Sequence, residues 1–468
     1  HDGGATGKKG KGQTSGEKGT ERCHGRNVRD GMAMRQHYPL STLPGTVHGR
    51  GDMEFNTLGI LILLALFALW NLDFIATLLN LKALSPELPA EFRDVFDADR
   101  YAKSQAYTRE SARFEIIHSI YSLGVLLVFW FLGGFGWLDQ FSRSLISGDI
   151  PAGLVFLGLL FVGHLLLHLP FSIYDTFVIE EKFGFNKTTP KTFAMDQVKS
   201  IILAAVIGLP FAAGILWIFG NVANAWLWAW GFFVAFQLFV TWLAPTLILP
   251  LFNKFTPMED GPLRQAIQSM ASKCGFPLGE ISVMDGSKRS TKANAFFTGF
   301  GKNKKIALYD TLVAEQEQDE LVAVLAHEIG HFKLKHIVQR LVVSMLQAGV
   351  LFYLLGLAVN PSGAFSRELF DAFGVADISP HVGLVLFGLL FSPASRILGI
   401  ASNAWSRKHE FEADAFAANA TGKPESLVSA LKKLSAKNLS NLTPHPFRVF
   451  LDHSHPPVLV RIEALRAL

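Results

Sequence analysis

The amino-acid sequence predicts an α-helical integral membrane protein with seven membrane-spanning helices and a small α+β domain outside the lipid. Half of the 468 residues are hydrophobic and only 18% are charged, and the mean hydropathy is +0.29, whereas soluble domains carry about 25% charged residues. Seven stretches are long and apolar enough to span a bilayer. One further segment of about 85 residues, 252–336, is polar and long enough to fold as a domain.

Each predicted span contains about 20 predominantly apolar residues, the length that crosses the hydrocarbon core of a bilayer. The first span is too long for a removable signal peptide and lacks a cleavage-site flank, so we expect it to remain as an anchor. The predicted spans are Thr57–Leu81, Phe114–Leu138, Ala152–Tyr174, Ile201–Gly220, Ala225–Leu251, Ile337–Ala358 and Val382–Trp405.

Basic residues alternate between the connecting segments. From the first loop to the C-terminal segment the numbers of Lys and Arg are 6, 1, 4, 0, 11, 1 and 9. Since Lys and Arg mark the cytoplasmic side of a membrane protein, loops one, three and five and the C-terminal segment are expected to face the cytoplasm.

The first 52 residues differ from the rest of the chain. They hold 12 Gly, 9 Lys or Arg and 5 Asp or Glu, with no apolar periodicity, which predicts a disordered tail. Because Met53 opens the first hydrophobic helix, we expect this tail to lie upstream of the true start; a genuine flexible extension is the alternative. The remaining body holds 34 basic and 34 acidic residues, which excludes nucleic-acid binding through a basic face.

Beyond the tail we expect two parts, an N-terminal membrane domain with five spans, 53–251, and a C-terminal domain, 252–468, that includes spans six and seven. Within the polar segment, Leu263–Lys273 has helical spacing, while Glu280–Met284 and Lys305–Tyr309 alternate like strands. A small α+β domain is therefore expected here.

The pattern HExxH occurs inside "DELVAVLAHEIGHFKLKH", as His327, Glu328 and His331. Positions four apart share one face of a helix, so two imidazoles can bind one Zn²⁺ while Glu328 stands beside the open coordination site. Zinc lowers the pKa of a bound water and Glu328 accepts its proton, which predicts peptide hydrolysis. In the alternative, both histidines are buried polar residues and Glu328 pairs with Lys333 or Lys335.

A catalytic zinc with two histidines and a water needs one more protein ligand. The candidate is Glu410 in "SRKHEFEADAFA", which begins at Ser406 just past the seventh span on the same side of the membrane. Asp414, one helical turn further on, can accept the free imidazole N–H of a ligand histidine and fix its tautomer. A solvated, highly charged helix start is the alternative reading of this segment.

Other patterns compete with this site. His164 and His168 are four apart in span three and form a conceivable second metal site without an acidic partner. Polar residues within the spans indicate either an enclosed wet chamber or hydrogen bonds between helices; they are Asn71, Asp73, Asn80 and Gln237. No phosphate-binding loop, GxSxG elbow or CxxC pair occurs, which removes ATPase, serine-hydrolase and redox functions.

Five segments carry a resemblance to a known family. They are "YDTFVIEEKFGFNKTT" from Tyr174, "SKRSTKANAFFTGFGKNKKIALYDTL" from Ser287, "LAHEIGHFKLKH" from Leu325, "SRKHEFEADAFA" from Ser406 and "HSHPPVLVRIEAL" from His453. Over Met53–Leu468 the chain resembles the CAAX prenyl protease 1 family of seven-span zinc endopeptidases. The HtpX-like quality-control proteases share HExxH and ExxxD, but the first segment and the seven spans favour the prenyl protease branch.

The resemblance implies roles for individual residues. His327, His331 and Glu410 match the zinc ligands, one ion per chain, and Glu328 matches the catalytic glutamate. The segment Asn294, Ala295 and Phe296 resembles a strand edge that binds extended substrate by backbone pairing; an ordinary turn leading into a strand is the alternative. His455 matches a family residue that stabilises the oxyanion, and Arg461 is a supporting cation.

The resemblance further implies an architecture and a reaction. The seven helices are expected to enclose an aqueous chamber, and the reaction is cleavage near a prenylated C-terminal C-a-a-X sequence. The partners would be a peptide or protein substrate and the lipid bilayer, with no nucleic acid. We expect a bacterial inner membrane with the zinc site facing the cytoplasm, or the ER membrane in a eukaryote. A seven-span transporter or receptor is the alternative of another class, which lacks support because the chain shows no inverted repeat.

Overall fold

The computed structural model describes residues 56–298 and 304–468, and the predicted tail, 1–52, lies outside these residues. Seven helical segments within them are long and apolar enough to cross a membrane, which confirms the predicted number of spans. The seven segments are Thr57–Lys82, Ala98–Phe131, Asp149–Glu180, Pro190–Asn221, Ala225–Phe252, His336–Ala358 and Pro380–Thr421.

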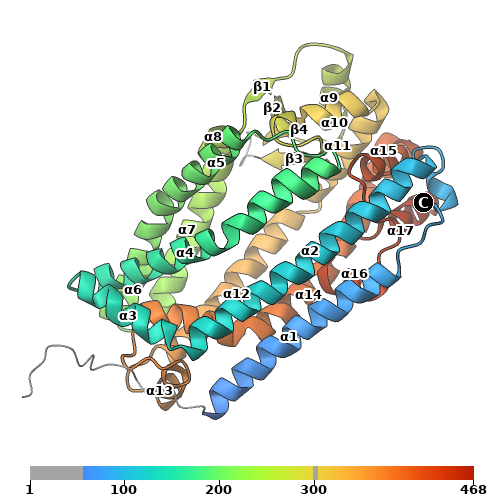
Figure 1. Ribbon diagram of the computed structural model, residues 1–468. Helices are drawn as coiled ribbons and strands as arrows, with labels where there is room; N and C mark the ends of the chain where they lie inside the picture. The colour runs from blue at the N-terminus through green and yellow to red at the C-terminus, as the bar shows by residue number, and fades with distance from the viewer. Residues whose placement is uncertain (1–55, 299–303) are drawn as a thin grey trace, which may run out of the picture. The chain divides into compact units, whose positions relative to one another are not determined.

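Four of these spans are single α-helices, which run as long rods through the bundle in Figure 1. They are α1 (Thr57–Lys82), α2 (Ala98–Phe131), α12 (His336–Ala358) and α14 (Pro380–Thr421). The other three contain a π-helical segment; they are α4 (Asp149–Tyr174) with η2 (Asp175–Glu180), α5 (Pro190–Leu203) with η3 (Ala204–Gly208) and α6 (Leu209–Asn221), and α7 (Ala225–Leu243) with η4 (Ala244–Ile248) and α8 (Leu249–Phe252).

Prolines account for two of the π segments. Pro210 and Pro250 each follow such a segment by two residues. A proline inside a helix has no N–H to donate, and its ring clashes with the carbonyl four residues earlier. That carbonyl falls within η3 or η4, so the widened turn accommodates the proline without ending the span.

The predicted second span, Phe114–Leu138, was wrong at its C-terminal end. The helix α2 stops at Phe131, and a new helix, α3 (Gly134–Leu145), begins after Gly133. Gly133 has a φ of 69°, in the left-handed region that favours glycine, so the chain changes direction there. At its other end α2 begins at Ala98, well before the apolar stretch, because charged residues continue the helix beyond the lipid.

The largest apolar core lies at the end of the bundle where α2, α3 and α4 meet α13 (Ala364–Asp371) and the start of α14. Trp130 stacks on Phe373 with ring centroids 4.2 Å apart, and its Nε1 donates to the carbonyl of Ala372 at 2.8 Å. Asp139 and His381 form a buried pair here, at 2.6 Å. These contacts hold the N-terminal spans against the start of α14.

Three of the four polar span residues singled out from the sequence make hydrogen bonds or ion pairs with other elements. Asp73 pairs with Arg396 of α14, and the amide oxygen of Asn80 accepts from the backbone N–H of His445 at 3.0 Å. Gln237 of α7 donates to Ser344 of α12 at 3.1 Å. Among the described residues, Asn71 bonds within its own helix, to the carbonyl of Phe67 at 2.8 Å.

A four-stranded sheet with its helices lies at the opposite end of the bundle from α3 and α13 (Figure 1). Its order is β1-β2-β4-β3. Strand β4 (Lys304–Tyr309) pairs parallel with β2 (Leu278–Met284), and the outer strands β1 (Phe255–Pro257) and β3 (Ala295–Thr298) pair antiparallel with β2 and β4. The predicted helix and two strands are present, and the sequence patterns missed β1 and left β3 undecided.

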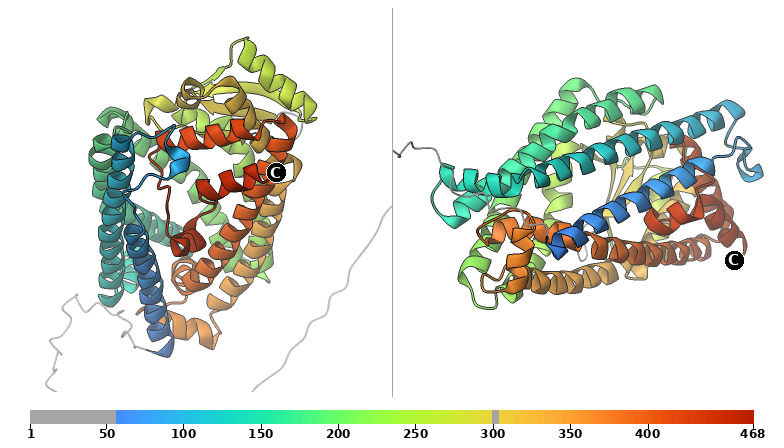
Figure 2. Two further views of the ribbon diagram at one scale, coloured as in Figure 1. Left: turned by 90° about the vertical axis from the view of Figure 1, so that its right-hand side faces the viewer. Right: turned by 60° about the horizontal axis from the view of Figure 1, so that its bottom comes forward.

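Helices cover this sheet and surround the C-terminal half of α14, as the two views in Figure 2 show. Ile306 and Leu308 of β4 pack on Leu321 and Leu325 of α11, and all four side chains are buried. The helices of this part of the chain are α9 (Pro262–Lys273), α10 (Asp310–Glu315), α11 (Gln318–Lys333), α15 (Pro424–Lys437), α16 (Pro446–Asp452) and α17 (Val458–Arg466). The described residues also contain two short 3-10 helices, η1 (Ala90–Phe92) and η5 (Gly286–Lys288).

Candidate metal centre

Helix α11 carries the HExxH residues, and its start is fixed by a capping box. The Glu317 side chain accepts from the backbone at the third helical position, and the Glu320 carboxylate accepts from the Glu317 N–H at 2.7 Å. Its apolar residues pack on the sheet and on α15, so the helix cannot turn about its axis without exposing them. His327 and His331 consequently lie on the face that meets α14.

Close contact between α11 and α14 brings the third predicted ligand to the two histidines. A Cβ atom added at Gly330 would lie 3.2 Å from the Cα of Ala413 and 3.2 Å from the Cβ of Phe416. Glycine therefore lets the two helix backbones approach closely at this crossing. Glu410 lies one turn before Ala413 on α14 and faces the imidazoles.

The ligand atoms of three residues have the spacing of a single tetrahedral metal site. His327 Nε2 lies 3.2 Å from His331 Nε2, and the two Glu410 oxygens lie 3.4 Å from His327 Nε2 and 3.3 Å from His331 Nε2. Ligands about 2.0–2.1 Å from a tetrahedral ion are separated by about 3.3 Å, so the arrangement has the right size. Glu410 Oε2 is buried and has no hydrogen-bond partner among the described residues, as expected of an atom that faces a cation.

Asp414 lies where the sequence placed it, behind the first histidine. Its Oδ1 is 2.8 Å from His327 Nδ1, on the side of the ring away from Glu410. Arg461 of α17, which is also buried, donates to both oxygens of Asp414 and lies 3.6 Å from Glu410. The carboxylate and guanidinium thus hold the imidazole with Nδ1 protonated and Nε2 free to bind a metal.

Charge and burial alter the pKa values on α11. Burial raises the pKa of Glu328, and the neighbouring histidines oppose the rise. At His327 burial works against protonation, but the carboxylates of Asp414 and Glu410 prevail and raise the pKa to about 9. A proton therefore competes strongly with a metal for His327.

His455 reaches the same carboxylate from the segment before α17. Its Nε2 lies 3.5 Å from Glu410 Oε1, and its Nδ1 is 3.0 Å from the Ser454 hydroxyl. The His455 side chain is 64% exposed, unlike the ligands themselves. Its outer face is therefore free to meet a substrate.

The segment Asn294, Ala295 and Phe296 leads into and forms β3, at one edge of the described sheet. Ala295 and Phe296 pair with Leu308 and Ala307 of β4, so the other side of this strand has backbone groups without a strand partner among the described residues. Asn438 fixes the approach to β3, because its side chain accepts from the N–H of Ala293 at 3.1 Å and donates to the carbonyl of Ala293 at 3.3 Å.

The structure also places residues at the centre that sequence reasoning missed. His336, the last histidine of "LAHEIGHFKLKH", lies 3.0 Å from His331, between Nδ1 atoms, and contacts Glu412 and His409. The return of the His336 ring to His331 is not apparent from the sequence. Lys335 has a φ of 59°, and this left-handed residue turns the chain between α11 and α12.

The second metal site considered at His164 and His168 has no support from the contacts of the described residues. His168 Nδ1 lies 2.7 Å from His118 Nε2 of α2. Within residues 56–298 and 304–468, two groups of side chains have the spacing of metal ligands, and neither includes these histidines. They are His327, His331 and Glu410, and His336, His409 and Glu412.

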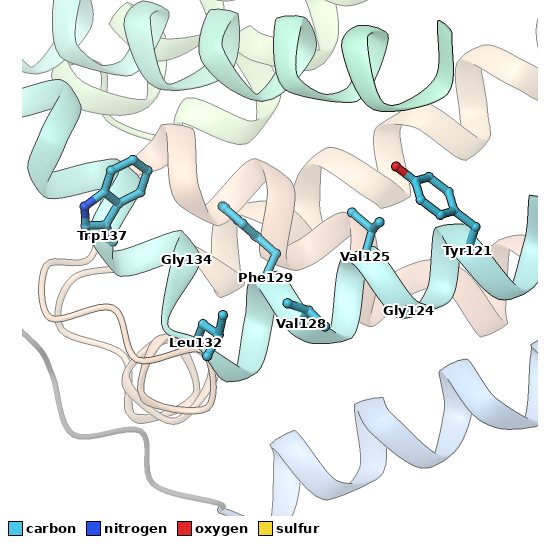
Figure 3. Close-up of a pocket in the computed structure, with 8 residues that line it drawn as sticks. All are labelled: Tyr121, Gly124, Val125, Val128, Phe129, Leu132, Gly134 and Trp137. Carbon is cyan, nitrogen blue, oxygen red and sulfur yellow. The ribbon is translucent and has the colours of Figure 1, made fainter. Parts of the chain in front are cut away.

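A pocket of about 630 Å³ on α2 and α3 is apolar and lacks metal ligands. Figure 3 shows its lining, in which Tyr121 and Trp137 lie at opposite ends. Its eight residues are Tyr121, Gly124, Val125, Val128, Phe129, Leu132, Gly134 and Trp137. The pocket therefore offers a mainly apolar surface.

Comparison with known proteins identifies the family. A family profile described as CAAX prenyl protease N-terminal, five membrane helices, matches residues 77–254, and the profile of peptidase family M48 matches residues 257–468. A CAAX prenyl protease 1 homolog of Oryza sativa subsp. japonica is 37% identical over 81% of this chain and 90% of its own length. The CAAX prenyl protease 1 of Saccharomyces cerevisiae is 37% identical over 82% of this chain and 89% of its own.

The fold agrees with these relatives. The crystal structure of S. mikatae Ste24p superposes with a TM-score of 0.81 at 36% identity, covering 88% of this chain and all of that one. Neither the quality-control protease nor the transporter or receptor alternative is favoured by these matches. The chain belongs to peptidase family M48, in the group of CAAX prenyl protease 1 and Ste24p, and is an integral membrane metallopeptidase.

Proposed function

We propose that the chain is a zinc endopeptidase that cleaves near the C-terminus of prenylated C-a-a-X proteins. The observation that carries this proposal is the spacing of His327, His331 and Glu410, whose ligand atoms lie 3.2–3.4 Å apart. Two imidazoles and one carboxylate suit zinc, and one ion per chain fills the centre. The substrate follows from the names of the relatives, which are CAAX prenyl proteases.

Three residues have separate roles in the proposed reaction, beside the metal itself. Bound zinc supplies Lewis acidity, which polarises the scissile carbonyl and acidifies a water. Glu328 accepts the proton of that water during attack and passes it to the leaving amine. His455, 3.5 Å from Glu410, donates to the oxyanion as it develops, and Arg461 supplies positive charge behind Glu410.

The edge of β3 provides a second, independent contact with substrate. An extended peptide that pairs with Asn294, Ala295 and Phe296 would continue the sheet by one strand. The Asn438 side chain hydrogen-bonds to both backbone groups of Ala293, so the strand edge is fixed where the peptide would begin to pair. Backbone pairing reads few side chains, which leaves the prenyl group to provide selectivity.

Membrane placement follows from charge. Loops one, three and five carry 6, 4 and 11 basic residues, so the metal centre should face the cytoplasm. The specific membrane would be the inner membrane of a bacterium or the ER membrane of a eukaryote. We further propose that the membrane part, 53–251, and the metalloprotease part, 252–468, meet near the position where the two family profiles adjoin.

The test uses the full chain in detergent or lipid with matched farnesylated and unmodified peptides. Glu328→Gln should abolish cleavage and keep stoichiometric zinc, because the amide cannot accept a proton but the ligands remain. Glu463→Gln, the same change on an exposed position of α17, is the control and should cleave normally. Residual cleavage by Glu328→Gln would assign the base elsewhere, and equal cleavage of both peptides would overturn the prenyl preference.

A further inference from the structure

A second cluster of metal-type side chains lies directly beside the centre and has no role in the reaction described above. It consists of His336 at the start of α12 and His409 and Glu412 on α14. His336 and His409 are 1% and 2% exposed, so both imidazoles are enclosed by the protein. His336 Nε2 lies 3.0 Å from Glu412 Oε2, and His336 Nδ1 lies 3.0 Å from Nδ1 of the ligand His331.

The orientation of the two rings argues against a second metal ion. His336 and His409 are stacked, with centroids 3.9 Å apart and planes inclined by 6°. The lone pair of an imidazole nitrogen lies in the plane of its ring. Two parallel planes separated by a stacking distance share no point, so one ion cannot lie in both. His409 instead packs against a face of His336 and fixes the plane of that ring.

The tautomers of the histidines can be followed outward from the metal. His331 presents Nε2 to Glu410 and His327, so a neutral ligand imidazole carries its hydrogen on Nδ1. That N–H points at His336 Nδ1, which must then accept. His336 consequently carries its own hydrogen on Nε2, where Glu412 accepts it. Each nitrogen and oxygen in this hydrogen-bond chain is therefore either a donor or an acceptor, without conflict.

We propose that His336 is the residue that positions the metal ligand His331, through a hydrogen-bond chain that ends on Glu412. This inference rests on the metal centre described above and not on the prenylated substrate. It gives the two ligand histidines matching support, since His327 is held by Asp414 and Arg461 and His331 by His336 and Glu412. Outer contacts of this kind orient ligands and raise their affinity for metal.

The turn between α11 and α12 explains how a residue five positions away supports its neighbour. Lys335 has a φ of 59°, which breaks the helix immediately before His336 and sends α12 off in a new direction. The side chain of His336 thereby returns to His331. A continuous helix would place a residue at this spacing on a different face.

The experiment measures zinc affinity, because a loss of peptide cleavage alone would not separate positioning from substrate binding. Metal-free full-length protein is titrated with Zn²⁺ against a competing chelator. His336→Phe keeps an aromatic ring for stacking on His409 but removes the acceptor, so zinc affinity should fall 10–100-fold. His336→Asn places an amide oxygen near the position of Nδ1 and should restore most of the affinity.

Two further variants complete the comparison. Glu412→Ala removes the outer acceptor and should lower zinc affinity by less than His336→Phe does. His164→Phe makes the same chemical change in α4 and should leave zinc affinity unchanged. Thermal unfolding of the metal-free proteins identifies any variant that fails to fold; if His336→Phe is lost in this way, Glu412→Ala and His336→Asn still test the chain.

Three results would overturn the proposal. Wild-type affinity in both His336→Phe and Glu412→Ala would show that His331 needs no such support. Equal losses in His336→Phe and His336→Asn would show that the imidazole serves packing alone. A second zinc per wild-type chain that disappears in Glu412→Ala would assign the cluster to metal binding. None of these outcomes depends on whether prenylated peptides are cleaved, so failure of the substrate proposal remains distinguishable.

Discussion

Arg461 donates two hydrogen bonds to Asp414, from Nε to Oδ2 at 2.8 Å and from Nη2 to Oδ1 at 2.6 Å. Both side chains are buried, and the Oδ1 atom held by Arg461 is the one that contacts His327. The guanidinium therefore fixes the carboxylate that in turn orients the His327 ring. Its planar fork matches a carboxylate in a way that an ammonium group does not.

Replacement of Arg461 by Lys should weaken the centre although it keeps the positive charge. We expect zinc affinity to fall about 10–100-fold, because Asp414 loses its two-point contact and His327 loses its orientation. Chelator competition on the purified protein measures this. The exposed Arg466 on the same helix, changed to Lys, is the control. Unchanged affinity in Arg461→Lys would show that charge alone suffices.

Zinc loading should depend on pH with a sign set by His327. Its pKa is raised to about 9 by Asp414 and Glu410 against the effect of burial. Below that value a proton occupies the ligand nitrogen, so the apparent zinc affinity should rise as the pH increases toward 9 and then level off. Asp414→Asn removes one cause of the raised pKa and should move the plateau to lower pH. A flat profile between pH 6 and pH 9 would contradict this.

The contact between α11 and α14 at Gly330 should be sensitive to side-chain size. A methyl group there meets Ala413 and Phe416 at 3.2 Å, which requires the helices to separate by a few tenths of an ångström. Gly330→Ala should lower zinc affinity modestly, and Gly330→Val should nearly abolish it, because Glu410 moves away with α14. Gly399→Ala, on α14 where the added carbon meets open space, should retain zinc. Equal loading of all three variants would refute the idea.

Stability should depend on the buried carboxylate that begins α11. Glu320 accepts from Ser429 at 2.6 Å and pairs with Lys433 at 2.8 Å, besides capping its own helix. Glu320→Ala should cost roughly 1–3 kcal/mol in unfolding free energy, because Lys433 and the helix N-terminus lose their acceptor. Unfolding monitored by temperature or denaturant measures this, and Glu463→Ala on an exposed face is the control.

Ionisation of Glu320 should also make the free energy of unfolding depend on pH. Burial alone would raise the pKa of Glu320, but hydrogen bonds from Lys433 and Ser429 lower it overall. A carboxyl with a depressed pKa in the folded state contributes stability above its unfolded value of about 4.3. That contribution is lost as the pH falls through the folded pKa. Wild type should therefore lose more stability than Glu320→Gln below that value, and parallel curves would disprove the assignment.

The sequence predicted which residues converge at the centre, His327, His331 and Glu410, because the chemistry of a zinc site leaves a local pattern in the sequence. HExxH is a spacing on one helix, and Glu410 was sought because two histidines leave a zinc one ligand short. Charge topology then limited the search to segments on the same side of the membrane. Asp414 followed from its position one turn beyond Glu410.

The outer support could be predicted only in part, because it depends on packing between distant elements. His336 reaches His331 because Lys335 adopts a left-handed conformation and turns the chain there. No sequence pattern predicts that conformation for a lysine. The apolar stretch continues to Leu138, but the helix ends before Gly133 and a new one begins after it. Hydrophobicity alone does not predict where a lipid-facing helix ends. Strand β1 has three residues, which is too short for an alternating pattern to be recognised.

Helix α14 is continuous from Pro380 to Thr421, so the seventh span and Glu410 belong to one helix. A rotation of the C-terminal half of this helix about its axis would turn the Glu410 carboxylate away from the imidazoles of His327 and His331. Any truncation that releases the part of the chain outside the bilayer must cut this helix, and the severed end would lie within a few turns of the proposed metal centre. Anchorage and chemistry are thus mechanically inseparable here, and the enzyme cannot be expected to work as a shed, water-soluble fragment.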